Sequence, residues 1–294
     1  MDKETRFLLR KFLIDAVCMG VVAFPLLMFK LFGEPFKRGF FCNDESISHP
    51  YRENTIASLA LYFIGFGVPI FIILCTEYWR TTKRTINDER QPNVVAGHDI
   101  PTWLWECYKV IGVFCFGAAC SQLTTDIAKY AIGRLRPHFM DICKPNIDCT
   151  LAENLHRYIE DFECMGTNTH RIHDSRLSFL SGHSSFSAYT MIFLALYVHS
   201  RWTWRGSKLA RHLVQFLAFS MAWYTALSRI SDYKHHWSDV LAGSFQGSLF
   251  AVLIVVYVTE LFPRQRYNYE QKSLNNSVLP MVQQEQKTTM EIDP

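Results

Sequence analysis

The amino-acid sequence predicts an all-α protein, a bundle of six helices that cross a membrane. Nearly half of the 294 residues, 49%, are hydrophobic. Apolar stretches of roughly 20 residues recur along the chain, which is the length that a helix needs to cross a ~30 Å hydrocarbon core. Because the apolar residues are gathered in this way, a single large soluble domain is the poorer explanation. The predicted spans are, in order, 12–32, 55–75, 110–130, 186–199, 213–227 and 240–262.

The spans differ in how strongly the sequence predicts them. The first is longer than the apolar core of a signal peptide and has no small-residue cleavage site, so it is expected to be a retained helix. The fourth and fifth are the shortest. Ser185 and Ser187 interrupt or flank the fourth, and His212 and Gln215 do the same for the fifth. Polar residues are tolerated where a membrane helix faces the interior of its bundle, so both stretches are still predicted to be membrane spans.

The connections and the tail complete the expected organisation. Residues 1–263 are predicted to form a single membrane domain. Residues 264–294 are rich in Gln, Asn, Ser and Thr with few aromatic residues, which predicts a disordered tail. Connection 80–102 is polar and charged. Connection 133–180 is too long for a simple turn and is expected to cover something.

Charge and cysteine placement predict the orientation. Basic residues favour a cytoplasmic N-terminus, and six spans then put both termini in the cytoplasm. Four of the nine cysteines fall on the proposed outer side, where oxidising conditions permit disulfides with three pairings open: Cys42, Cys143, Cys149 and Cys164. A net charge of +3 without a basic tract argues against nucleic-acid binding. The sequence does not decide between the plasma membrane and an internal membrane, or whether the chain forms a homo-oligomer.

Two cations end the third span. Lys129 and Arg136 are seven residues apart, about two helical turns, so they share one face if the helix continues until Pro137 ends it. Arginine presents a planar fork that matches phosphate oxygens, and lysine presents a compact charge. The alternative is that such cations extend to lipid headgroups, which is the expectation for Arg134.

The second segment is Ser181-Gly182-His183, where connection 133–180 enters the fourth span. Backbone N–H groups at a helix N-terminus point toward a bound anion, and Gly182 permits close approach. Taken alone, Ser181 would be read as a helix cap and His183 as a structural histidine. A histidine with the usual pKa of about 6.5 nevertheless suits the protonation of a leaving alkoxide.

The third segment lies between the fifth and sixth spans. It contains Ser228-Arg229, followed by His235 and Asp239. At a spacing of four, the carboxylate is expected to reach one imidazole nitrogen and leave the other free to attack. His236 and Asp232 lack that spacing and are interpreted as surface or lid residues. A six-span path brings all three segments to the same outer side.

A metal site is the alternative for this third segment, because His235, His236 and Asp239 are all metal-ligating residue types. The neighbouring Lys129, Arg136 and Arg229 would repel a metal ion and attract phosphate. No metal or other cofactor is therefore expected.

The pattern Lys-x6-Arg-Pro, Ser-Gly-His and Ser-Arg-x5-His-x3-Asp resembles the type 2 phosphatidate phosphatase superfamily, which also includes vanadium haloperoxidases and bacterial acid phosphatases. Residues 38–46, 176–179, 181–186 and 228–239 look like the animal lipid phosphate phosphatases in particular. The resemblance covers about residues 12–263. Leu180 departs from it, since proline is frequent before Ser-Gly-His, and this affects loop rigidity more than activity.

The resemblance implies a helical catalytic core and a metal-independent phosphomonoesterase. It implies that His183 protonates the leaving group and that His235 attacks phosphorus, supported by Asp239, to form a phosphohistidine. Phosphate would be bound by Lys129, Arg136, Ser181, Gly182 and Arg229. The expected substrates are lipid phosphates at the outer or lumenal leaflet, namely phosphatidate, lysophosphatidate, sphingosine-1-phosphate and ceramide-1-phosphate.

Two other functions remain as alternatives. A membrane phosphatase for soluble substrates, similar to glucose-6-phosphatase, shares the same motifs. The sequence of residues 38–46, which looks like that of the animal lipid phosphate phosphatases, argues against it. A non-catalytic adhesion or scaffold relative would have lost the chemistry, whereas His183, His235 and Asp239 are intact.

Overall fold

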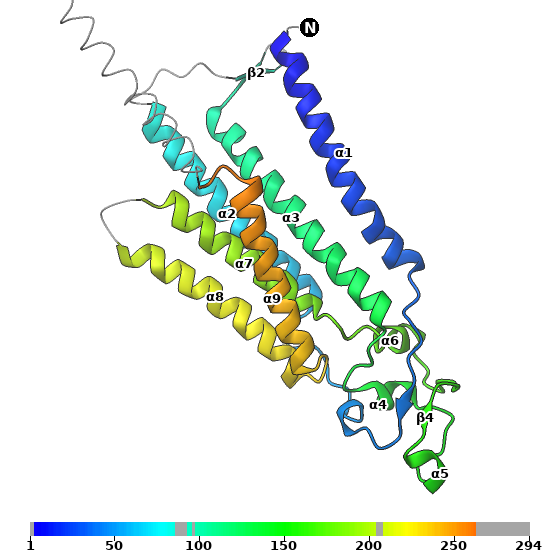
Figure 1. Ribbon diagram of the computed structural model, residues 1–294. Helices are drawn as coiled ribbons and strands as arrows, with labels where there is room; N and C mark the ends of the chain where they lie inside the picture. Colours follow the sequence, from blue (N-terminus) through cyan, green and yellow to red (C-terminus); the bar gives the residue numbers. More distant parts are fainter. Residues whose placement is uncertain (1–2, 86–92, 96–97, 204–207, 263–294) are drawn as a thin grey trace, which may run out of the picture. The chain divides into compact units, whose positions relative to one another are not determined.

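Six long helices follow the predicted order (Figure 1). The structure, a computed structural model, describes residues 3–85, 93–95, 98–203 and 208–262. Within these residues, the helices of 17 residues or more are α1 (Lys3–Phe32), α2 (Ser58–Thr85), α3 (Thr102–Ile132), α7 (Gly182–Arg201), α8 (Lys208–Ser231) and α9 (Trp237–Leu253). Helix α9 continues as the π-helix η2 (Ile254–Val258), so the last helix ends before the predicted boundary at 262.

Four of these helices are long and apolar enough to cross a membrane. They include Thr5–Phe32, Ser58–Lys83, Thr102–Ile132 and Trp237–Val258. Helices α7 and α8 are long enough but more polar. The mostly helical fold and the apolar spans are consistent with an integral membrane protein, and the count of six spans stays a prediction.

Helix α7 is polar because it lies inside the bundle. It packs against α2, α3, α8 and α9, and its polar side chains Ser184, Ser185, Ser187 and Thr190 are buried. Helix α1, by contrast, packs mainly on α3 (Figure 1). A helix surrounded by other helices can carry hydroxyl groups that would be unfavourable against lipid.

The N-terminal halves of α7 and α9 are in backbone contact. A Cβ atom on Gly243 would lie 2.6 Å from the carbonyl oxygen of Ser181, and one on Gly247 would overlap the carbonyl oxygen of Ser185. Gln246 accepts a hydrogen bond from the Ser185 hydroxyl and donates one of 3.1 Å to the backbone oxygen of Ser121 in α3. These contacts hold α3, α7 and α9, which carry Lys129, His183 and Asp239, in a fixed register.

Helix α3 does not continue to Pro137, so the condition for Lys129 and Arg136 to share a helix face is not met. The helix ends at Ile132, because Gly133 adopts a left-handed conformation with φ 57° and its N–H bonds the Lys129 carbonyl oxygen. Glycine is the usual residue at such a C-terminal cap. Arg136 therefore lies beyond the helix, where its N–H donates to the Ser175 carbonyl oxygen at 2.8 Å.

Connection 133–180 folds together with the connection between α1 and α2. It contains α4 (Phe139–Cys143), α5 (Ala152–Leu155), β4 (Tyr158–Ile159) and α6 (Thr169–Asp174). Strand β4 pairs antiparallel with β1 (Phe40–Phe41), which precedes the 3-10 helix η1 (Glu45–Ile47). Figure 1 shows these short elements near the end of the bundle at which α3 ends and α7 begins.

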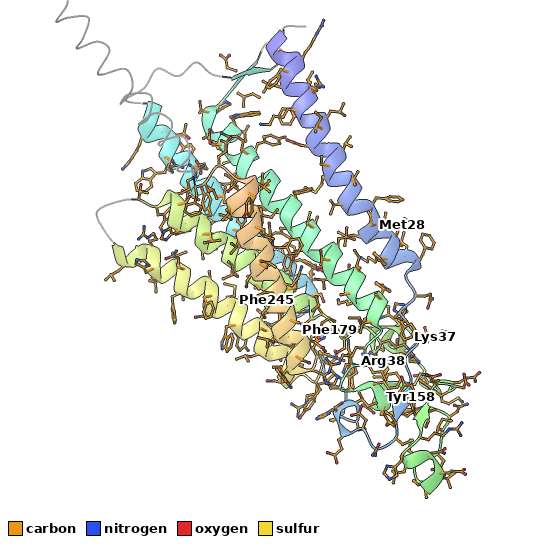
Figure 2. All side chains as sticks on the ribbon, viewed as in Figure 1. Met28, Lys37, Arg38, Tyr158, Phe179 and Phe245 are labelled. Atoms are coloured by element: carbon orange, nitrogen blue, oxygen red, sulfur yellow. A yellow bond between two sulfur atoms is a disulfide. The ribbon has the colours of Figure 1, made fainter. Side chains whose placement is uncertain are left out.

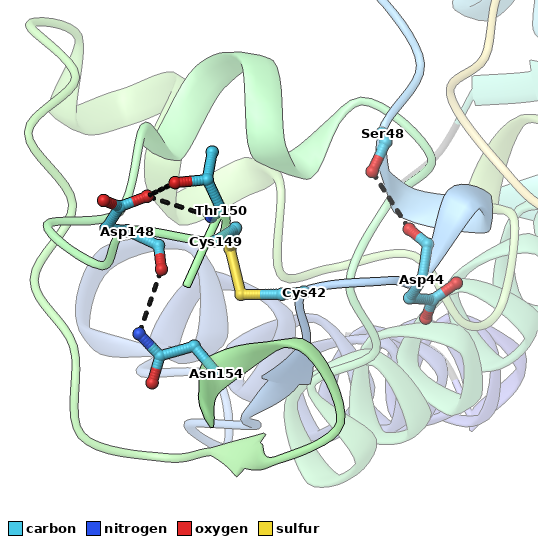
Figure 3. The surroundings of a disulfide bond; sticks show 7 residues. All are labelled: Cys42, Asp44, Ser48, Asp148, Cys149, Thr150 and Asn154. Atoms are coloured by element: carbon cyan, nitrogen blue, oxygen red, sulfur yellow. Dashed lines mark hydrogen bonds between the residues drawn. A yellow bond between two sulfur atoms is a disulfide. The ribbon is translucent and has the colours of Figure 1, made fainter. Parts of the chain in front are cut away.

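Two disulfides select one of the three open pairings. They join Cys42 to Cys149 and Cys143 to Cys164. Figure 3 shows the first of them beside a turn in which Asp148 accepts two hydrogen bonds from Thr150. Residues 38–48 and 139–164 thus form a cross-linked unit, here called the disulfide cap, with a small apolar core that includes Phe40, Phe139 and Ile159.

The predicted connection 80–102 contains regular structure that was not expected. Helix α2 extends into the predicted connection 80–102, where β2 (Asn93–Val95) and β3 (His98–Ile100) form an antiparallel pair that was not predicted. Residues 1–259 form one unit and residues 260–294 another. The predicted disordered tail, 264–294, lies outside the described residues.

Candidate active site

The three predicted segments meet at one end of the bundle. Lys129 is in the last turn of α3, His183 in the first turn of α7 and Arg229 in the last turn of α8. A Cβ atom on Gly182 would lie 3.0 Å from the Lys129 ammonium nitrogen. The cations that act most strongly on the His235 imidazole are Arg136 and Lys129.

His235 is held as a neutral imidazole. Its Nδ1 atom lies 2.7 Å from the carbonyl oxygen of Ser178. Because a carbonyl oxygen only accepts hydrogen bonds, Nδ1 carries the proton and Nε2 keeps its lone pair. Burial, together with the charges of Arg136 and Lys129, holds the pKa of His235 well below its usual value. Nε2 of His235 can therefore act as a nucleophile at neutral pH.

Asp239 does not hold His235 in the expected way. Its Oδ2 atom is 4.0 Å from Nδ1 of His235, and it accepts hydrogen bonds from the Ser178 hydroxyl at 2.6 Å and the His236 N–H at 3.1 Å. The spacing of four is not a helical spacing, because α9 begins at Trp237. Asp239 caps the start of that helix and contacts His235 through Ser178.

The His183 ring has an unsatisfied nitrogen. Nε2 is buried and has no hydrogen-bond partner within the described part of the chain, while the ring also faces the backbone of Ile56. The cations that act most strongly on this ring are Arg229, Lys129 and Arg136. A buried polar atom without a partner costs free energy, which a bound oxygen atom would recover.

Arg136 and Arg229 are each paired with a carboxylate that sequence reasoning missed. Two nitrogens of Arg136 lie 2.8 Å from the two oxygens of Asp174. Arg229 is 1% exposed and donates to Asp232 at 2.7 Å. Asp232 was expected at the surface but is 5% exposed, because it is the counter-ion of a buried guanidinium.

Lys129 has a counter-ion at the limit of ion-pair distance. Its ammonium nitrogen lies 3.9 Å from Asp126, one helical turn earlier. It also lies beside the N-terminus of α7, where Ser181 is the N-cap and accepts a 2.9 Å hydrogen bond from the Ser184 hydroxyl. The position of Gly182 lets the ammonium group approach this helix end closely. A phosphate here would meet both the lysine and unpaired backbone N–H groups.

Arg134 differs from its expected headgroup contact. It donates hydrogen bonds to the Asp239 carboxylate and, at 2.8 Å, to the Ser238 hydroxyl. The buried Asp239 charge is thus compensated by a guanidinium from the α3–α4 connection.

The alternative of a metal site gains no support. Nδ1 of His235 faces a backbone carbonyl oxygen, and so does Nε2 of His236, which lies 3.0 Å from that of Leu135. Among the described residues, no group of three or more His, Cys, Asp or Glu side chains could hold a metal ion.

Residues 49–56, here called the strap, bring further contacts that no motif indicated. Asn54 accepts a 2.9 Å hydrogen bond from Arg229, and Thr55 donates to Asp232 from both its N–H and its hydroxyl, at 2.8 and 2.6 Å. Thr55 was predicted to begin the second span. The strap follows the first span and so lies on the same predicted outer side as the three motif segments. This was the one feature of the sequence that could have placed the strap near the site.

The fold and the site define a class of protein, a helical membrane protein in which the ends of several helices assemble two histidines among cations. The chain belongs to the PAP2 superfamily, whose family model matches residues 111–263 and so includes every predicted site residue.

Related proteins cover most of the chain. A Drosophila melanogaster protein whose name assigns it to the phosphatidate phosphatases is 49% identical over 90% of this chain and 72% of its own length. Phospholipid phosphatase 1 of Rattus norvegicus is 42% identical over 90% of this chain and 91% of its own length. Phospholipid phosphatase 2 of Homo sapiens is 41% identical over 85% of this chain and 83% of its own length. No solved structure matches the chain.

Proposed function

We propose that this protein is an integral membrane lipid phosphate phosphatase that works through a phosphohistidine. The observation that carries the proposal is the place of His235, whose Nδ1 atom lies 2.7 Å from the Ser178 carbonyl oxygen, beside the charges of Arg136 and Lys129. Such a site binds a phosphoryl group and attacks it without a metal ion. The names of the related proteins support a lipid substrate.

The proposed reaction has two displacements. Nε2 of His235 attacks phosphorus, the bond to the ester oxygen breaks, and His183, acting as an imidazolium, gives the leaving alkoxide a proton. His183 then takes a proton from water, which attacks phosphorus and breaks the phosphorus–nitrogen bond. Inorganic phosphate is released and both imidazoles return to their starting states. Lys129, Arg136 and Arg229 stabilise the charge on the phosphoryl oxygens in both steps.

The position of the site at the end of the helix bundle favours a lipid substrate. The cations lie at the ends of apolar helices, so an acyl chain can stay in the bilayer while its phosphate enters. We propose phosphatidate, lysophosphatidate, sphingosine-1-phosphate and ceramide-1-phosphate as the substrate class.

The test is a panel of phosphomonoesters given to purified protein in detergent micelles, with a chelator present throughout. We expect hydrolysis of the four lipid phosphates, a kcat/KM at least about tenfold lower for glucose-6-phosphate, and no loss on chelation, because the site binds phosphate with protein cations. A preference for the sugar phosphate would support the soluble-substrate alternative. No hydrolysis at all by folded protein would support the non-catalytic one.

We further propose that the site faces the outside of the cell or a lumen, with both termini in the cytoplasm. The disulfide cap supports this orientation, because Cys143 and Cys164 lie in the same connection that supplies Arg136 and Asp174. Disulfides form and persist in oxidising compartments.

Intact cells that express the protein at their surface should hydrolyse a phosphomonoester that cannot cross the membrane. Phosphate release should be about the same before and after permeabilisation, because the site is already accessible from outside. Cells expressing His235→Ala supply the background rate. Hydrolysis that appears only after permeabilisation, with surface expression verified, would show that the orientation is inverted.

A further inference from the structure

Lys234 is fixed next to the proposed nucleophile. The N–H groups of Lys234 and His235 both point to the carbonyl oxygen of Arg229, at 3.0 and 3.3 Å. The preceding Tyr233 adopts a left-handed conformation with φ 54°, which turns the chain between α8 and α9. The backbone of Lys234 is therefore held in a fixed relation to both Arg229 and His235.

The side chain of Lys234 is buried, and its ammonium group lies over an aromatic ring. The residue is 3% exposed, and its Nζ atom lies 3.6 Å from the centre of the Tyr51 ring, which belongs to the strap. Among the described residues, Nζ has no hydrogen bond or ion pair within bonding distance. The cations Lys129, Arg136 and Arg229 each have a carboxylate within 4 Å. A ring face compensates a buried charge less fully than a carboxylate does.

Charges of both signs act on the ammonium group of Lys234. Arg136 and Arg229 repel it, whereas Asp174 and Glu53 attract it. Other titratable groups that face it are Tyr51 and His138. Burial and the charge of Arg136 lower the pKa of Lys234 to about 8. An anion placed among Lys234, Arg136 and Arg229 would favour the charged ammonium form.

We propose that Lys234 is a fourth phosphate-binding cation, held by Tyr51 until a phosphate monoester dianion enters, and that it recognises the second negative charge of that dianion. The inference rests on the proposed function and deepens it. It also gives a role to Tyr51, and so to the strap. The strap lies before the residues that the family model matches.

The test compares Lys234→Met, Lys234→Arg and the control Lys37→Met in full-length protein. Lys37 is exposed and lies between α1 and β1 (Figure 2). We expect Lys234→Met to raise both KM and the inhibition constant of inorganic phosphate about tenfold, as for loss of one charge-assisted hydrogen bond. Lys234→Arg should keep both constants within about threefold of the original protein, because it restores the charge.

A pH series separates a binding role from a structural one. Phosphate monoesters stay dianionic above about pH 7, so any loss of affinity at higher pH comes from the protein. Phosphate should inhibit the original protein less strongly as Lys234 loses its proton above its pKa of about 8. This loss should move to higher pH in Lys234→Arg and be absent in Lys234→Met. If Lys234→Met does not fold, the comparison with Lys234→Arg still decides.

Three results would overturn the inference while leaving the phosphatase proposal intact. These are unchanged KM and phosphate inhibition in active Lys234→Met, equal losses in Lys234→Met and Lys234→Arg, and equal pH profiles for Lys234→Arg and the original protein. An original protein that neither hydrolyses phosphomonoesters nor binds phosphate would instead refute the proposed function itself.

Discussion

Replacing His235 with alanine should lower turnover of a lipid phosphate by about 10³-fold or more, because the proposed first step has no other nucleophile. Asp239→Asn should keep a measurable fraction of the activity. Asp239 acts on His235 through Ser178, and the Ser178 carbonyl oxygen remains available to hold Nδ1. The measurement is kcat on a single lipid phosphate in mixed micelles, with folding verified by thermal unfolding.

His156→Ala is the matched control for this prediction. His156 is exposed in the disulfide cap and should have no effect on turnover. Labelled phosphate should also be recovered on His235 after rapid denaturation of the original protein at alkaline pH. Near-normal turnover by folded His235→Ala would exclude the proposed covalent mechanism.

Loss of His183 should depend on the leaving group. For a lipid phosphate, whose alkoxide needs a proton, His183→Ala should lower kcat by about 10² to 10⁴-fold. For an aryl phosphate, whose phenolate leaves unprotonated, phosphorylation of His235 should be affected much less. Hydrolysis of the phosphohistidine should still be slow, because no base then activates water, so the intermediate should accumulate.

Single-turnover kinetics with both substrates measure the two steps separately. His170→Ala, a change at another exposed histidine, supplies the control. Equal losses on alkyl and aryl phosphates, without accumulation of phosphohistidine, would mean that His183 only shapes the site.

Much of the architecture could be predicted because it follows from local pattern. Apolar stretches of spanning length gave the positions of the six long helices, and the number of spans between motifs gave the shared end of Lys129, His183 and His235. The residues at which helices end were harder to predict. Hydropathy gives no sign that α3 ends at Gly133, before Arg136, since the end of the helix depends on the backbone conformation of this one residue.

The partners of the charged residues could not be predicted for a different reason. Asp174 is 38 residues from Arg136, and Asn54 is 175 residues from Arg229. No periodicity encodes such pairs, which form only when the connections fold against the helix ends. Asp232 is close to Arg229 in sequence, but its burial was missed because the strap that covers it carries no motif.

The contact between α7 and α9 limits which residues the chain can accept far from any functional group. Gly243 and Gly247 bear no side chain, yet a single added methyl group would meet the backbone that begins at the N-cap of the His183 helix. His235 lies two residues before the start of α9, so the close approach at these glycines bears on the separation of the two histidines. A side chain at position 243 or 247 is therefore expected to disturb the site, although neither glycine takes part in the chemistry.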